Sequence, residues 1–117
     1  MGRCKQFNVP FDFTVSGHRF PAGSYIVGRG RYLATIRSAG DGPYATFATI
    51  PSPARVPTEQ SQLVFVRCGD HYRLQKLWTA GQEIGSEVLK TKRERRLERE
   101  LEVRGAEIER VVLVASN

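Results

Sequence analysis

Cysteine and histidine are scarce in this 117-residue chain, which contains two of each. Cys4 and Cys68 allow one disulfide or two free thiols, and neither lies in a CxxC or another spacing typical of zinc sites. Cys68 shares an apolar strand face with Val64 and Val66, so we expect it to be a buried structural thiol. With so few potential ligands, the sequence predicts no metal site and no cofactor.

Groups that could perform catalysis also lack partners in the sequence. His18 and His71 each adjoin a turn, where histidine is usually solvated. A Cys68–His71 dyad has the right residue types, but the two residues flank a tight hairpin and the thiol is expected to point inward. The acidic residues are not clustered at spacings that suggest paired carboxylates. We therefore predict a non-enzymatic protein with no catalytic residues, and the sequence assigns no ligand-binding residue.

Long apolar runs are absent as well. No segment approaches the roughly 18 apolar residues that a membrane-spanning helix needs, so we expect no membrane span. The first residues lead directly into a strand-like pattern without the features of a secretory signal. We expect a periplasmic or secreted protein if a leader has been removed, and a cytoplasmic one otherwise.

The chain is rich in apolar/polar alternation, beginning with apolar residues at every second position from Phe7 to Val15. Alternation of this kind predicts a strand with one buried face and one solvated face. Pro10 cannot donate a ladder hydrogen bond, which favours an edge strand or a bulge there. Further strand patterns cover 19–27, 32–37, 44–50, 63–67, 71–78 and 111–114.

Glycine and proline mark the breaks between these segments. Gly69-Asp70 predicts a hairpin turn, whereas three prolines within 51–57 predict an irregular loop. The residues around Gly28 and Gly30 are not followed by the helix that a phosphate-binding loop requires, which favours a simple turn. Residues 79–85 have the composition of a loop. The segment 111–114 is apolar on both faces, so we expect it in the middle of the sheet.

One intensely charged segment, 90–104, changes the period from strand to helix. Thr91 and Glu94 match a capping box, and Gly105 is a typical helix stop. Leu97 and Leu101 form a narrow apolar stripe, which predicts the face that packs on the sheet. A helix with so thin an apolar face should lie on the surface and be the softest regular element of the fold.

Together these patterns predict a mainly β fold, a small antiparallel barrel or sandwich of about seven strands with one charged helix at about 90–104. We expect a single β-rich domain over 1–117, because neither half carries enough core alone. Phe11, Phe13, Phe65 and Trp78 are expected to meet in its core. An exposed edge strand would allow homo-oligomers to form.

The net charge of +6 permits a different class of function, a nucleic-acid-binding β-barrel with a basic, aromatic surface. The residues that could supply this surface are Tyr32, Tyr44, Tyr72, Arg29, Arg31 and Arg73. The charged segment, however, mixes four glutamates with seven basic residues, so no continuous phosphate track is apparent. We therefore expect binding to nucleic acid or other acidic polymers to be weak, independent of sequence and lost with rising salt.

Three parts of the sequence together resemble a family of small, uncharacterised, often secreted bacterial proteins of the acidobacterial type: 7–17 with 20–27, 63–67 with 72–81, and 85–97. The resemblance implies one β-rich domain and an envelope or secreted setting, and it transfers no site residue. The residues before Phe7 lack the pattern of a leader, so in this respect we expect the chain to differ from the family. Our leading expectation is a non-enzymatic binding or structural module of the bacterial envelope, with the nucleic-acid-binding barrel as the alternative; the ligand and partners are unknown.

Overall fold

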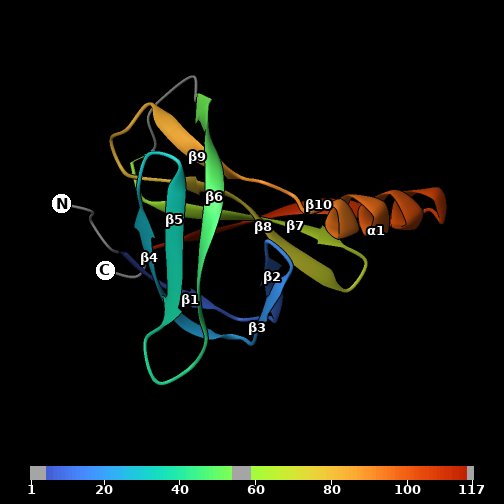
Figure 1. Cartoon of the computed structure of the whole chain (residues 1–117), viewed down its shortest axis with the longest axis horizontal. Helices are drawn as coiled ribbons and strands as arrows, with labels where there is room; N and C mark the ends of the chain where they lie inside the picture. Colours follow the sequence, from blue (N-terminus) through green and yellow to red (C-terminus); the bar gives the residue numbers. More distant parts are fainter. Residues whose placement is uncertain (1–4, 54–58, 116–117) are drawn as a thin grey trace.

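The computed structural model describes residues 5–53 and 59–115, which form ten strands and one helix (Figure 1). The strands are β1 (Lys5–Val9), β2 (Phe13–Val15), β3 (His18–Phe20), β4 (Gly23–Arg29), β5 (Leu33–Ser38), β6 (Tyr44–Pro53), β7 (Gln62–Cys68), β8 (His71–Trp78), β9 (Ile84–Val88) and β10 (Ile108–Val114), and the helix is α1 (Lys92–Val103). The predicted mainly β class with one charged helix is confirmed, with ten strands in place of about seven.

All ten strands belong to one open, mixed sheet with the main order β1-β4-β5-β6-β9-β8-β2-β3. Strand β8 is its branch point. One edge of β8 pairs with β7. Its other edge pairs with two strands: β2 runs parallel to it at Arg73, and β9 runs antiparallel to it at Lys76 and Leu77. Strand β10 pairs with β7 at the end of this branch. The described strands are not hydrogen-bonded into a closed barrel.

The sheet curves around one hydrophobic core in which aromatic rings meet. The ring of Phe13 stacks on Phe20 at 5.4 Å between centroids and meets Phe65 edge-on at 5.3 Å. Phe11 packs against this core from a partly buried position, with its ring 5.0 Å from that of Phe65. Trp78 lies outside the core cluster, so its predicted place in the core is wrong. Its ring rests on Gly85, where an added Cβ would lie 2.3 Å from it.

The first alternating segment is two strands, not one. Strand β1 ends at Val9, and β2 begins at Phe13 after a break at residues 10–12 that contains Pro10. The carboxylate of Asp12 accepts a hydrogen bond from the backbone N–H of Ala22 at 2.9 Å. Because β1 pairs with β4 and β2 pairs with β3 and β8, this break carries the chain from one part of the sheet to another.

Strand β6 extends through two of the prolines that predicted an irregular loop. Pro51 and Pro53 lie opposite Ser86 and Ile84 of β9, a strand that the sequence interpretation missed by assigning 79–85 to a loop. The backbone N–H of Thr49 points away from β9 and donates to Tyr32 O at 2.9 Å. Backbone nitrogens two and four residues further along a strand face the same side. The prolines therefore remove no donor from the β6–β9 ladder. The rest of the predicted irregular loop, from residue 54 onward, lies outside the described part of the chain.

Strand β10 lies at the edge of its branch, which corrects the prediction that 111–114 occupies the middle of the sheet. Val111 and Leu113 pack against the core, while Ile108, Val112 and Val114 are exposed on the other face. Apolar residues on both faces therefore do not place a strand centrally here, because the described sheet provides this strand with one hydrogen-bonded neighbour, β7.

Helix α1 begins and ends as the sequence predicts. The Thr91 hydroxyl accepts from the backbone N–H of Glu94 at 3.1 Å, and Glu94 Oε1 accepts from the N–H of Thr91 at 2.9 Å, which completes the capping box. Gly105 follows with a φ of 82°. The predicted packing face is wrong, however, because Glu94 and Glu98 are buried whereas Leu97 is exposed. Within the described residues, no helix is long and apolar enough to cross a membrane.

Candidate functional site

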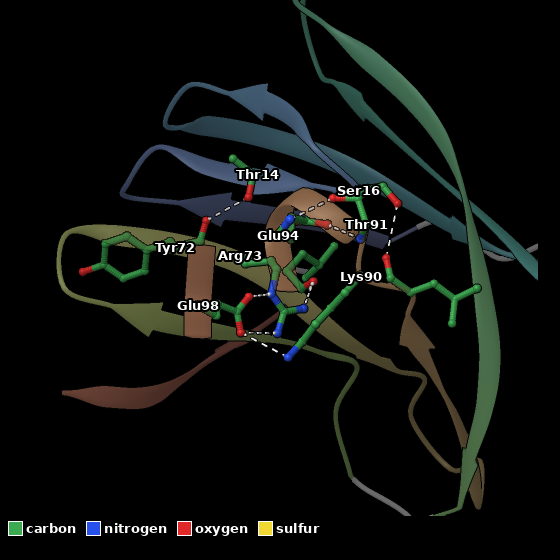
Figure 2. A network of polar contacts seen from close by, with 10 residues as sticks. Thr14, Ser16, Tyr72, Arg73, Lys90, Thr91, Glu94 and Glu98 are labelled. Carbon is green, nitrogen blue, oxygen red and sulfur yellow. Dashed lines mark hydrogen bonds and ion pairs between the residues drawn. The ribbon is translucent and has the colours of Figure 1, made fainter. Parts of the chain in front are cut away.

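The Arg73 cluster, which we define as Arg73, Glu98 and Lys90, explains why the helix turns Glu98 toward the sheet (Figure 2). Arg73 Nε donates to Glu98 Oε2 at 2.6 Å, and Lys90 Nζ lies 3.1 Å from Glu98 Oε1. The Arg73 and Glu98 side chains are only 4% and 11% exposed. Arg73 lies on the outer face of β8, so a helix docked there must present a carboxylate to it, because an unpaired buried guanidinium is costly.

Electrostatics in the Arg73 cluster favour the charged form of Glu98. Burial by itself raises the pKa of this carboxyl, but the hydrogen bond and charge of Arg73, followed by those of Lys90, outweigh burial, so the pKa lies below its ordinary value. The nearby Cys68 is buried, as predicted, and it is a free thiol. Burial, followed by the charges of Glu98 and Glu102, raises its pKa. A thiol with a raised pKa is a poor nucleophile. Cys4 lies outside the described residues.

The second arginine with several polar contacts is Arg29, at the end of β4. Its Nε donates to Ser86 Oγ at 3.1 Å, and its Nη2 donates to the carbonyl oxygen of Ile84 at 3.1 Å. Its Nη1 donates to Thr79 Oγ1 and, at 3.3 Å, to Gln82 Oε1. All four acceptors come from the β8–β9 connection and from β9 itself. The β8–β9 connection and β9 therefore hold the guanidinium in a fixed orientation.

The charge of Arg29 is not balanced by these contacts, because every acceptor is a neutral oxygen. Burial lowers the pKa of Arg29, and no carboxylate contributes to the shift. A guanidinium stays protonated at neutral pH even so. A fixed, partly buried positive charge with neutral partners attracts an anion more strongly than one already paired with a carboxylate.

Arg29 lies in a groove of about 1220 Å³ between the tip of the β4–β5 hairpin and the β8–β9 connection. We call this the Arg29 groove; its described lining residues are Arg29, Gly30, Arg31, Tyr32, Pro51, Thr79, Ala80, Gln82, Ile84, Gly85 and Ser86. Two of these side chains are positively charged and none is acidic. The hairpin tip is anchored by Gly30 N donating to Leu33 O at 2.7 Å and by the Thr49–Tyr32 bond. The groove therefore combines net positive charge with a supported rim.

The structure divides the six residues of the predicted nucleic-acid surface. Arg29, Arg31 and Tyr32 meet in the Arg29 groove. Tyr44 is exposed but does not line the groove. It pairs with Arg37 on β5, four residue pairs along the β5–β6 ladder from Leu33, the residue that follows Tyr32.

The remaining two residues, Tyr72 and Arg73, contact the core and the helix instead of the groove. Tyr72 stacks on Phe11 at 3.9 Å, and Arg73 is buried in its pair with Glu98. Sequence reasoning named Arg29 but missed Ser86, Thr79 and Gln82, because β9 and the connection before it carry no local pattern that links them to a residue 50 or more positions earlier.

Metal chemistry finds no support in the described residues, where no three histidine, cysteine or acidic side chains are grouped to hold an ion. Comparison of the chain with protein-family models, with curated proteins and with solved structures finds no match. The resemblance of the sequence to small, often secreted bacterial proteins therefore stays a prediction.

Proposed function

We propose that this protein is a non-enzymatic binding module that holds an anionic group of its ligand in the Arg29 groove. The observation that carries the proposal is the partly buried guanidinium of Arg29, whose four acceptors are all neutral. Among the described lining residues there is neither a histidine nor a carboxylate to act as a general base. This supports binding in preference to catalysis.

The contact between Arg29 and Gln82 is where the anion would enter. It is the longest of the four hydrogen bonds, at 3.3 Å, and it is exposed. The Arg29–Gln82 bond has one charged partner, whereas a bond from the guanidinium to an anionic oxygen has two, so the anion is attracted more strongly and would displace the Gln82 amide. Ser86 and Ile84 would continue to orient the guanidinium, and Arg31 at the rim would add long-range attraction.

Titration with inorganic phosphate, followed by amide NMR shifts at constant ionic strength, tests the proposal. We expect saturable shifts at Gly30, Tyr32 and Gly85, and at least a tenfold weaker dissociation constant in Arg29→Gln. Arg37→Gln is the matched control, because Arg37 is exposed on β5 outside the groove and its loss changes the net charge equally. Equal weakening in both variants, or shifts that do not saturate, would show non-specific attraction and contradict the proposal.

Single-stranded nucleic acid is the second candidate ligand, because the same open groove places an exposed tyrosine beside two arginines. Bases stack on such rings while arginines hold phosphates. Titration with oligonucleotides at low and physiological salt separates this candidate from a general charge effect. Affinity that vanishes at physiological salt for every sequence, as the sequence analysis predicts, would leave the small anion as the ligand.

A further inference from the structure

We propose that the ligand of the Arg29 groove is a phosphate monoester of a ring-bearing compound, with its ring stacked on Tyr32 and its phosphate at Arg29. This inference rests on the proposed function and adds the chemical class of the ligand. It combines three features of the groove: the exposure of the tyrosine, the number of positive charges and the space between the walls.

Tyr32 is unusual among the tyrosines that line pockets in this protein. Its side chain is 59% exposed, and among the described residues it takes part in no ring–ring or cation–π contact. Tyr72, by contrast, stacks on Phe11 and lies 5.9 Å from the guanidinium carbon of Arg67. The backbone of Tyr32 is nevertheless fixed to β6 through its carbonyl oxygen. An anchored aromatic residue at a groove rim offers a stacking surface at low entropic cost.

The charge of the groove favours phosphate over carboxylate. Arg29 and Arg31 supply two positive charges, and no described lining residue is acidic. A phosphate monoester carries about −1.5 to −2 charges near neutral pH and three strong acceptor oxygens, whereas a carboxylate carries one charge. The dianion therefore matches the charge of the two guanidinium groups, and a carboxylate would leave one of them without a counter-charge.

The space in the groove exceeds what a single phosphate needs. Its volume of about 1220 Å³ is larger than the roughly 300–1,000 Å³ of ordinary small-molecule sites, so an attached ring would fit beside the phosphate. The β4–β5 tip forms one wall and the β8–β9 connection forms the other, with Arg29 between them. A ligand with both groups would thus contact both walls at once.

The test compares three probes, inorganic phosphate, phenyl phosphate and benzoate, by NMR or calorimetric titration at pH 7.5. We expect phenyl phosphate to bind about five- to tenfold more tightly than phosphate, because one aromatic contact contributes a factor of this order. Benzoate should bind more weakly than phenyl phosphate. The ring advantage should disappear in Tyr32→Leu while the affinity for inorganic phosphate stays unchanged.

Tyr44→Leu is the matched control, because Tyr44 is 80% exposed and lies outside the groove. A ring advantage that persists in Tyr32→Leu, is lost equally in Tyr44→Leu, or is absent from the native protein would overturn the inference while leaving the anion site intact. If phosphate itself does not bind, both the inference and the proposed function fail.

A mononucleotide and a hexanucleotide with a 5′-phosphate, each of which carries one phosphate monoester, then distinguish the two natural sources of such chemistry. Equal affinity for both probes would identify a free ring-bearing phosphate as the ligand. Affinity that rises with strand length would identify a nucleic-acid strand. Binding of neither probe, with phenyl phosphate also failing to exceed phosphate, would overturn the inference.

Discussion

Arg29 and Arg73 are two partly or fully buried arginines on the same sheet, and they differ in what neutralises them. Arg73 is 3% exposed and pairs with the carboxylate of Glu98 from a helix. Arg29 is oriented by hydroxyl, amide and carbonyl oxygens and keeps its charge. A paired guanidinium holds two elements together, whereas an oriented but unpaired one is available to an anion from outside.

The difference separates a neutralised charge from an unneutralised one within one fold. At Arg73 the positive charge is satisfied within the chain, which accounts for the burial of Glu98 on α1. At Arg29 four hydrogen bonds orient the guanidinium, but no carboxylate neutralises its charge. The contrast leads to opposite expectations: changes at Arg73 should act mainly on stability, and changes at Arg29 should act mainly on binding.

The largest effect is expected from Arg73→Leu, which leaves Glu98 buried with Lys90 as its remaining partner in the cluster. Removing one member of a buried ion pair costs about 3–5 kcal/mol, which urea unfolding would measure. The double variant Arg73→Leu/Glu98→Leu should recover much of this loss, because apolar side chains replace both charges. A loss below about 1 kcal/mol in the single variant would show that the pair is hydrated and does not anchor the helix.

A smaller loss is expected on acidification, because Glu98 then loses its charge while Arg73 and Lys90 remain. The pKa of Glu98 is lower in the folded protein than in the unfolded chain, so its contribution is complete above the unfolded value of about 4.3 and disappears as pH falls through the folded value. Urea unfolding from pH 7 to pH 2 should show this acid-dependent loss in the native protein. Glu98→Gln should lack that component; identical pH profiles would refute the assignment.

Gly85→Ala should destabilise β9, which carries two of the acceptors of Arg29. Its added Cβ would meet the ring of Trp78 at 2.3 Å and the carbonyl oxygen of Leu77 at 2.9 Å. Forced overpacking of this kind costs about 1–3 kcal/mol. Gly40→Ala is the control, because nothing lies within 4 Å of its added Cβ, and its effect should stay within about 0.5 kcal/mol. Similar thermal unfolding of the two variants would contradict the contact.

The smallest effect on stability is expected from Arg29→Leu, despite the loss of four hydrogen bonds. Two of those bonds are exposed, so water can replace the guanidinium there, and the net loss should be about 1 kcal/mol. Phosphate binding should be lost in the same variant, as titration would show. A stability loss as large as that of Arg73→Leu would mean that Arg29 is structural, and the comparison between the two sites would fail.

Much of the fold follows from local sequence patterns. The hairpin at Gly69, the strand 71–78 and the capping box of α1 all occur where the residues predict them. These features depend on interactions between residues only a few positions apart, such as Thr91 with Glu94. The strand predictions were wrong where pairing with a distant strand determined the structure. Pro51 and Pro53 of β6 are an example, because they are tolerated in the strand only since their nitrogens face away from β9.

The sequence by itself determined the mainly β class, the position and ends of the helix, the buried thiol and the basic charge. The tertiary structure decided which helix face is buried, because the arginine of β8 beneath it requires a carboxylate rather than a leucine. It also decided the different environments of Arg29 and Arg73, since their partners lie 25 to 57 positions away. Local patterns report on a residue's own element, and only the packing of distant elements determines whether a charge is neutralised within the chain.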